Sequence, residues 1–168
     1  MSAIPTDEQL DSLAAQVGRL AHAKHHMIVT AESCTAGWVA KTLTDMAGSS
    51  AWFESGVAVY SYEAKQALLG VRPETLEVFG AVSQETVLEM VSGAIAKSGG
   101  TLAVAVTGIA GPGGGTADKP VGTVWLAWKQ RGGYPLARVY SFEGNRDAVR
   151  RQAVQTALNG LLETLQSN

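Results

Sequence analysis

The sequence predicts a single layered α/β/α domain, residues 1–168, with a mixed sheet that includes a C-terminal antiparallel hairpin. In the first part of the chain, short apolar runs alternate with amphipathic stretches, as they do when helices connect neighbouring strands. Two β-branched and aromatic runs, 121–129 and 138–142, then follow each other around a glycine-containing turn at 131–133. Runs joined in this way pair as a hairpin, so we expect both parallel and antiparallel pairs in the sheet.

Each expected element rests on a local pattern. Hydrophobic residues recur at helical spacing in six stretches, and several of these begin with a capping residue such as Thr6, Ser83 or Asn145. The predicted helices cover 7–20, 38–43, 61–69, 73–79, 83–95 and 146–165. Short β-forming runs predict further strands at 27–30, 57–60 and 102–106. We expect segment 47–56 to be a connection whose aromatic pair, Trp52 and Phe53, packs on the core.

Composition limits the classes of function. The chain has 46% apolar and 17% charged residues, which suits a packed core. Its net charge is −2 and it has no basic run, so we expect a small-molecule partner and no nucleic acid or membrane. No apolar stretch approaches the ~18 residues of a membrane-spanning helix, and no signal-peptide pattern is present. Together with a single cysteine, Cys34, these features predict a cytoplasmic protein.

Metal binding is not expected, although three histidines lie close together. His22, His25 and His26 follow the first predicted helix, but no carboxylate or cysteine stands beside them at the spacing of a metal site. A solvated helix end explains them, because positive charge is favoured at a helix C-terminus. We therefore expect neither a metal nor a cofactor.

The segment TAESCTAGW, residues 30–38, lies where a predicted strand gives way to a helix. The first N–H groups of a helix have no partner within it, so Ser33 or Thr35 can cap them, and the same groups can hold an anion. Two interpretations remain open: a structural N-cap, or a nucleophilic Ser33 beside backbone donors for an oxyanion. The segment differs from the G-x-S-x-G motif of α/β-hydrolases, because Ala31 and Thr35 occupy its glycine positions.

The segment TGIAGPGGGT, residues 107–116, follows a predicted buried strand. Such glycine density is typical either of backbone that approaches a ligand closely or of a flexible surface loop. The segment fits neither a Walker A motif nor a dinucleotide-binding motif. Arg146 stands in the first turn of the last predicted helix, where a cation is unfavourable. Anion binding is one explanation for Arg146, and a plain surface position is the other.

Taken together, four separated motifs resemble the C-terminal domain of the competence-damage-inducible protein CinA. They are TAESCTAGW, SGVAVYSYEAK, VTGIAGPGGG followed by KPVGTVW, and FEGNRDAVR, and the resemblance extends from about Leu10 to Leu162. Free-standing members of this family include amidohydrolases that release ammonia from nicotinamide mononucleotide and give nicotinate mononucleotide, in pyridine-nucleotide recycling. The resemblance implies this activity and a nucleotide substrate for the present chain.

The resemblance also implies roles for individual residues. Ser33 matches the family's nucleophile, and Tyr60 and Lys65 match the tyrosine and lysine of its Y-x-x-x-x-K segment, so these three are the expected catalytic residues. No histidine lies in the four motifs, which leaves Lys65 as the expected base and later acid, helped by Tyr60. The expected substrate-binding residues are Thr35, Thr107, Gly108, Ile109, Gly111 and Arg146, of which Arg146 would hold the substrate phosphate.

One departure from the family pattern concerns Ala36, which stands where the family usually has the first of two glycines. We expect its methyl group to narrow the pocket or shift the backbone donors, which bears on substrate range more than on chemistry. Two classes of function stay open: a serine amidohydrolase, or a non-catalytic nucleotide-binding or regulatory module with the same pocket. The presence of Ser33, Tyr60 and Lys65 favours catalysis. Four tryptophans in a rather apolar chain favour a homodimer.

Overall fold

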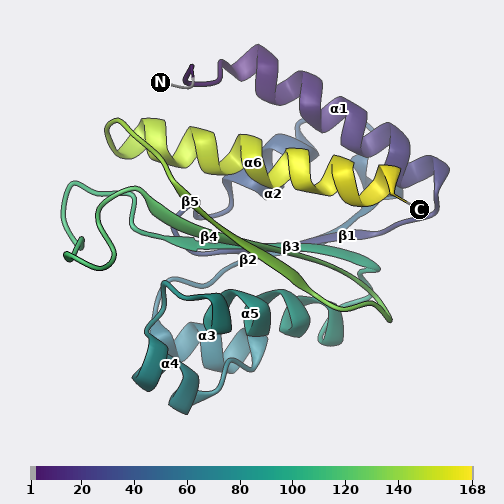
Figure 1. The fold of residues 1–168 in the computed structure, drawn as a ribbon. Helices are drawn as coiled ribbons and strands as arrows, with labels where there is room; N and C mark the ends of the chain where they lie inside the picture. The colour runs from purple at the N-terminus through teal and green to yellow at the C-terminus, as the bar shows by residue number, and fades with distance from the viewer. Residues whose placement is uncertain (1–2, 168) are drawn as a thin grey trace.

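The computed structural model describes residues 3–167 and shows three layers (Figure 1). The elements in chain order are α1 (Asp7–Ala23), β1 (Ile28–Glu32), α2 (Trp38–Thr44), the 3-10 helix η1 (Ser49–Ala51), β2 (Phe53–Ala58), α3 (Tyr62–Leu69), α4 (Pro73–Phe79), α5 (Gln84–Ala96), β3 (Leu102–Gly108), β4 (Thr123–Gln130), β5 (Leu136–Ser141) and α6 (Arg146–Gln166). The sheet lies in the middle, with α1, α2 and α6 on one face and α3, α4 and α5 on the other. The predicted α/β/α layering is confirmed.

The sheet is mixed, with the strand order β2-β1-β3-β4-β5. Strand β1 pairs in parallel with β2 and β3, whereas β4 pairs antiparallel with β3 and β5. The predicted C-terminal hairpin is therefore confirmed. Because the parallel strands β1, β2 and β3 end at the same edge, the residues that follow them come together there, where α/β sheets place their ligands.

Most helices begin where a capping side chain stands. Thr6 accepts the Gln9 N–H in a capping box at the start of α1. The side chains of Ser61, Ser83 and Asn145 accept backbone N–H groups at the starts of α3, α5 and α6. Local sequence thus suffices to locate these helix starts, as predicted.

The second strand begins earlier than predicted. Phe53 pairs with Ile28, and β2 ends at Ala58, so part of the predicted connection 47–56 is strand and the predicted strand at 57–60 is displaced. Polar side chains do not prevent this pairing, because β2 is an edge strand that alternates between a partly buried and an exposed face. Trp52 and Phe53 pack against the core, as predicted.

Two apolar clusters, one on each face of the sheet, hold the layers together. Val104 of β3 belongs to the cluster that includes Leu158, and its neighbour Ala105 belongs to the opposite cluster with Met90. Successive side chains of a strand point to opposite faces, so a strand covered on both faces is apolar throughout, as predicted for β3. Within residues 3–167, no helix is long and apolar enough to cross a membrane.

Candidate active site

Lys65 and Ser33 meet at the edge where the parallel strands end. Ser33 follows β1, and Lys65 lies in α3, which follows β2. The Lys65 Nζ is 3.0 Å from the Ser33 Oγ, although the two residues are 32 positions apart in the chain. The fold thus places the expected base within hydrogen-bond distance of the expected nucleophile.

Lys65 is fully buried and is held by two backbone carbonyls. Its Nζ donates to the Val59 O at 2.9 Å and to the Tyr60 O at 3.2 Å. Burial lowers the pKa of Lys65, because the charged ammonium loses its hydration. The Nζ also donates to the Ser33 Oγ, and loss of one proton would leave two N–H groups for the carbonyls and a lone pair for the Ser33 hydroxyl. The arrangement therefore suits proton transfer from Ser33 to Lys65.

The turn that carries Ser33 is not capped as its sequence suggested. The N-cap position of α2 is Gly37, and the Thr35 Oγ1 donates to the Glu32 carboxylate at 2.6 Å. That carboxylate also accepts N–H groups at the start of α2. Of the two open interpretations, the structural N-cap by Ser33 or Thr35 is thus wrong, because Glu32 accepts the N–H groups at this helix start. The Thr35 hydroxyl, expected to contact substrate, is occupied by the same carboxylate.

Cys34 lies beside Ser33 but is in a different environment. It is buried, and burial raises the pKa of its thiol to about 12. The thiolate, and not the thiol, is the nucleophilic form of cysteine. At neutral pH Cys34 therefore stays protonated, and Ser33 is the better placed nucleophile of the two.

Tyr60 approaches Lys65 through its backbone and not through its hydroxyl. Its ring is largely exposed, and its Oη accepts from the Arg146 Nη2 at 3.1 Å. The Arg146 Nη1 donates to the Gly111 O at 2.8 Å. Arg146 therefore connects the glycine-rich loop to Tyr60. We expected the Tyr60 side chain to assist Lys65 in proton transfer, and no direct contact between the two side chains supports this.

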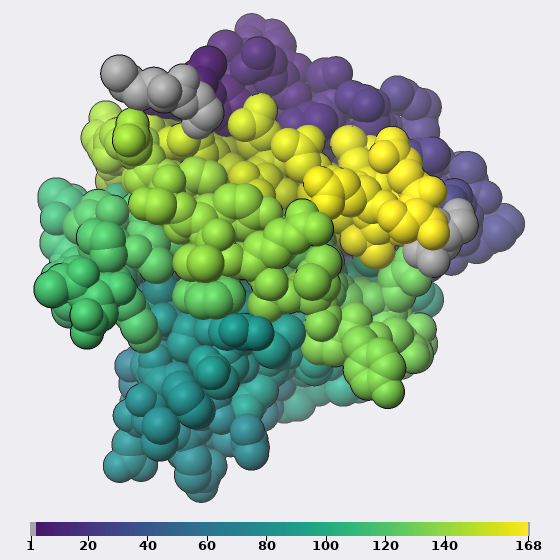
Figure 2. Space-filling model, viewed as in Figure 1, coloured from purple at the N-terminus to yellow at the C-terminus, as the bar shows by residue number. Residues whose placement is uncertain are grey.

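The start of the glycine-rich segment is part of the sheet. The Thr107 Oγ1 donates to the Ala81 O at 2.8 Å, and the Ile109 N–H donates to the Thr123 O at 2.9 Å. A Cβ at Gly108 would lie 2.8 Å from that same Thr123 carbonyl, so the close approach of β4 requires a glycine there. The close approach of β4 thus explains this glycine, and substrate contact at Gly108 stays a prediction. The connection between β3 and β4 projects beyond this point (Figures 1 and 2).

Ala36 adopts a backbone conformation that favours glycine. Its φ is 51°, and the following Gly37 has φ 93°. A left-handed alanine costs on the order of 1 kcal/mol, because its Cβ crowds the next carbonyl oxygen. The turn after Ser33 is thus strained at the position where the family usually has glycine. The effect of the Ala36 methyl on substrate range stays a prediction.

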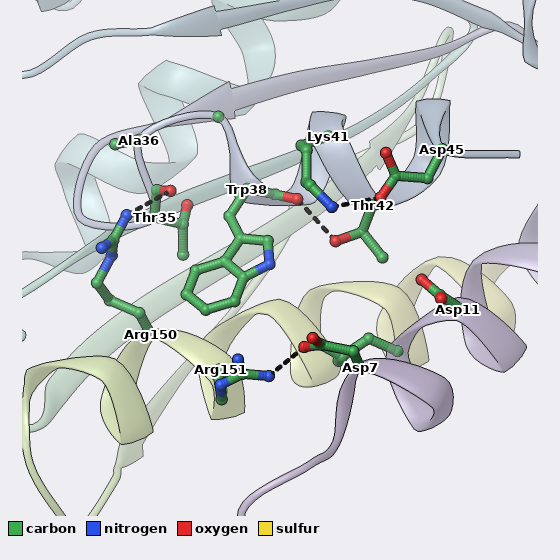
Figure 3. A pocket seen from close by; sticks show the side chains of 12 residues that line it. Asp7, Asp11, Thr35, Ala36, Trp38, Lys41, Thr42, Asp45, Arg150 and Arg151 are labelled. Atoms are coloured by element: carbon green, nitrogen blue, oxygen red, sulfur yellow. Dashed lines mark hydrogen bonds and ion pairs between the residues drawn. The ribbon is translucent and has the colours of Figure 1, made fainter.

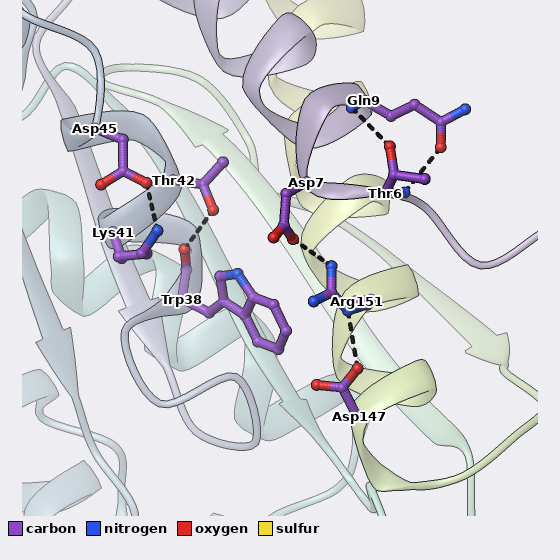
Figure 4. Close-up of polar contacts among 9 residues, drawn as sticks. All are labelled: Thr6, Asp7, Gln9, Trp38, Lys41, Thr42, Asp45, Asp147 and Arg151. Atoms are coloured by element: carbon purple, nitrogen blue, oxygen red, sulfur yellow. Dashed lines mark hydrogen bonds and ion pairs between the residues drawn. The ribbon is translucent and has the colours of Figure 1, made fainter.

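A hollow of about 510 Å³ lies behind this turn, between α1, α2 and α6 (Figure 3). Four charged residues on its walls form two ion pairs, Arg151 with Asp7 and Lys41 with Asp45 (Figure 4). Arg151 also pairs with Asp147, which does not line the hollow. Neither Ser33 nor Lys65 lines this hollow, so it is separate from their contact.

Arg150 reaches from the hollow to the Ser33 turn (Figure 3). Its Nε donates to the Cys34 O at 3.0 Å, and its Nη2 donates to the Thr35 O at 3.3 Å. Its guanidinium also lies 5.3 Å from the centre of the Trp38 ring, a cation–π distance. Arg150 thus ties the turn to α6.

Sequence reasoning missed Glu32 and Arg150. The available signal for Glu32 in the sequence was a carboxylate just after the predicted strand 27–30. In the structure β1 extends to Glu32 and is buried throughout. Arg150 had no such signal, because its partners are main-chain carbonyls, one of them 116 positions away. Among the described residues, no group of three or more His, Cys, Asp or Glu is arranged to hold a metal ion.

The fold and the site define a layered α/β protein with a hydroxyl nucleophile candidate beside a buried amine. The chain belongs to the CinA C-terminal domain family, whose model matches residues 10–165. The resemblance carried by the four motifs is confirmed.

Similar proteins cover nearly the whole chain. It is 51% identical over 163 residues to the nicotinamide-nucleotide amidohydrolase PncC of Escherichia coli strain K12, covering 97% of this chain and 99% of that protein. It is 48% identical over 156 residues to the protein of the same name from Pseudomonas putida, covering 93% and 97%. The crystal structure of the competence/damage inducible protein CihA from Agrobacterium tumefaciens matches with a TM-score of 0.90 at 46% identity, covering 99% of both chains.

Proposed function

We propose that the protein is an amidohydrolase that converts nicotinamide mononucleotide to nicotinate mononucleotide and ammonia, with Ser33 as nucleophile and Lys65 as base. The observation that carries the proposal is the 3.0 Å contact between the buried Lys65 Nζ and the Ser33 Oγ. The substrate is inferred from the similarity to proteins named nicotinamide-nucleotide amidohydrolase.

The chemistry follows from the pairing of hydroxyl and amine. A primary carboxamide is a poor electrophile, so its hydrolysis needs an activated nucleophile. The Ser33 Oγ attacks the carboxamide carbon while its proton moves to the Lys65 Nζ. The C–N bond then breaks, and Lys65 returns the proton to the nitrogen, which leaves as ammonia. Water attacks the Ser33 ester, Lys65 takes a proton from that water, and the proton returns to Ser33 as the acid product leaves.

The oxyanion formed in this attack needs backbone donors, and several near Ser33 are occupied. The Ser33 N–H donates to the Val106 O at 2.9 Å, and N–H groups at the start of α2 donate to Glu32. We therefore assign the oxyanion donors to the N–H groups of Cys34 and Thr35. The Cys34 carbonyl shares a peptide unit with the Thr35 N–H, so its hydrogen bond from Arg150 orients this donor.

The phosphate is the second group of the substrate that needs a partner. Arg146 has five N–H donors, and its bonds to the Gly111 O and the Tyr60 Oη leave others for an anion. Its place at the start of α6 adds the positive end of the helix dipole. We assign the 5′-phosphate to Arg146, next to the exposed ring of Tyr60.

The test is ammonia release from nicotinamide mononucleotide by the purified protein, with Ser33→Ala as the control. We expect equal amounts of ammonia and nicotinate mononucleotide from the parent and none from the variant, while calorimetry shows that both bind the substrate. Binding by the parent without ammonia release would contradict the proposal and favour a non-catalytic nucleotide-binding module.

A further inference from the structure

Glu32 is a buried carboxylate that the chemistry above does not use. It is the last residue of β1, and its side chain is shielded from solvent. Within residues 3–167 it forms no ion pair with a lysine, arginine or histidine. Burying a charge costs free energy unless hydrogen bonds replace its hydration. The hydrogen bonds of Glu32 therefore indicate its role.

Four donors surround the carboxylate. The Glu32 Oε2 accepts from the Thr35 Oγ1 at 2.6 Å, the Gly37 N–H at 3.1 Å and the Val39 N–H at 3.0 Å. The Oε1 accepts from the Ala40 N–H at 2.9 Å. Glu32 thereby supplies the acceptors that a helix start normally finds in a capping side chain.

These contacts lie on both sides of a strained segment. Ala36 and Gly37 have φ values of 51° and 93°, so two consecutive residues are left-handed. Thr35 precedes this pair, and Val39 and Ala40 follow it. The carboxylate therefore holds together the residues on either side of the left-handed pair, Ala36 and Gly37. Without this support the strained backbone of Ala36 would relax.

Ser33 lies in the chain between Glu32 and the left-handed pair, Ala36 and Gly37. Its N–H donates to the Val106 O at 2.9 Å, and its carbonyl accepts the Ala36 N–H at 3.1 Å. A shift of the left-handed pair is therefore transmitted to Ser33 through this hydrogen bond from Ala36. Lys65 is fixed through the carbonyls of Val59 and Tyr60. The Val59 N–H donates to the Glu32 O at 2.8 Å, so this support is joined to the backbone of Glu32 and not to its carboxylate. The distance between the Ser33 Oγ and the Lys65 Nζ depends on both supports staying in place.

We propose that Glu32 is a positioning residue that holds the Ser33 nucleophile against Lys65. The carboxylate touches neither the Ser33 Oγ nor the amine, and it acts through the geometry of the turn. Thr35 works with it, because its hydroxyl donates the shortest of the four hydrogen bonds. The inference rests on the proposed function, since it concerns the same nucleophile.

The test compares Glu32→Gln with a matched control, Glu89→Gln. A glutamine keeps the size of the side chain but replaces one acceptor oxygen by an NH2 group, which cannot accept the backbone N–H groups. The Glu89 carboxylate accepts from the Arg72 N–H at 2.8 Å and the Thr75 Oγ1 at 2.7 Å at the start of α4. It holds a different helix start through a backbone N–H and a threonine hydroxyl, and unlike Glu32 it also pairs with the Arg72 guanidinium at 2.7 Å.

Two rates are measured: kcat for nicotinamide mononucleotide, and the rate at which a fluorophosphonate probe labels Ser33. A misplacement of about 1 Å lowers a rate on the order of 10²-fold, so we expect both rates to fall by about that factor in Glu32→Gln. Because binding groups are unaffected, KM should change by less than about threefold. Glu89→Gln should lower Tm and leave both rates within about twofold of the parent.

A second variant covers the case in which Glu32→Gln does not fold. Thr35→Val keeps the carboxylate and removes one donor, and we expect labelling of Ser33 to slow about tenfold. Unchanged labelling in folded Glu32→Gln, or in Thr35→Val if the first variant fails to fold, would overturn the proposal. A parent protein that is labelled at Ser33 but releases no ammonia would contradict the proposed substrate alone, and the labelling comparison would still decide the role of Glu32.

Discussion

Two groups of residues meet at the edge of the sheet, and they differ in burial. Lys65 is fully buried and Ser33 is 8% exposed, whereas Tyr60 is 65% exposed and Arg146 lies at the surface. Burial lowers the pKa of Lys65 and restricts the access of water to the pair, and the proposed proton transfer needs both. The second group offers an accessible guanidinium to an incoming anion.

This difference suggests that catalysis and recognition are divided between neighbouring parts of the site. Substitutions in the buried pair should lower kcat, because in the proposed mechanism that pair acts on the reacting amide. Substitutions in the exposed group should lower kcat/KM in proportion to what the substrate's phosphate contributes. Four substitutions test this division.

Ser33→Ala should have the largest effect. Removing the nucleophile of a covalent mechanism lowers turnover by roughly 10⁴-fold or more. The small side chain should leave substrate binding intact, because within residues 3–167 the only hydrogen bond of the Ser33 Oγ is that to Lys65. Steady-state kinetics and calorimetry on the same preparation measure both quantities. Residual turnover near the parent rate would place the nucleophile elsewhere.

Lys65→Arg should lower the rate by about 10²–10⁴-fold, the usual contribution of a general base. A guanidinium stays charged, so the arginine variant should lose as much as Lys65→Ala. In the parent, kcat/KM should rise with pH as Lys65 loses its proton, with a midpoint below the ~10.4 of a free lysine, because burial lowers its pKa. Near-normal turnover by Lys65→Arg would make Lys65 a structural residue.

Arg146→Ala should weaken processing of nicotinamide mononucleotide by about 2–5 kcal/mol in transition-state binding. Nicotinamide riboside, which has no phosphate, should be a poor substrate of the parent and should be affected little by the substitution. The measurement is kcat/KM for both substrates in both proteins, with Arg138→Ala as a surface control whose guanidinium pairs with Glu163. Equal losses for the two substrates would show that the phosphate binds elsewhere.

Cys34→Ala should have the smallest effect. The thiol is buried and its pKa is raised to about 12, so it contributes packing and no reactive thiolate. We expect most activity to remain, with a stability loss of about 1 kcal/mol from the smaller side chain. Activity assays and thermal unfolding check both effects. Loss of turnover in a folded Cys34→Ala protein would move the nucleophile from Ser33 to Cys34.

The sequence was sufficient to predict the helices whose ends are marked by capping residues and glycines. Helix α3 starts after the Ser61 cap and ends before Gly70, whose φ is 70°, and both signals are visible in the chain. The start of β2 was not predictable in this way. Its first residue, Phe53, is strand because it pairs with Ile28 in β1, and such pairing between distant segments overrides local propensity.

The site shows the same limit. Family motifs pointed to Ser33 and Lys65, and their contact depends on how α3 packs against the end of β1. The contacts of Glu32 and Arg150 involve main-chain groups of one turn, so residue identity alone does not reveal them. The catalytic roles, the phosphate contact of Arg146 and a homodimer stay predictions.

In the proposed mechanism Ser33 forms a covalent ester with the substrate while Lys65 takes up its proton. The most direct measurement mixes the protein with nicotinamide mononucleotide, quenches with acid within the first turnover, and maps the peptides by mass spectrometry while ammonia is counted. We expect a nucleotide ester on Ser33, absent from Ser33→Ala. An adduct on Cys34, or a burst of ammonia equal to the amount of protein with no ester on Ser33, would contradict it.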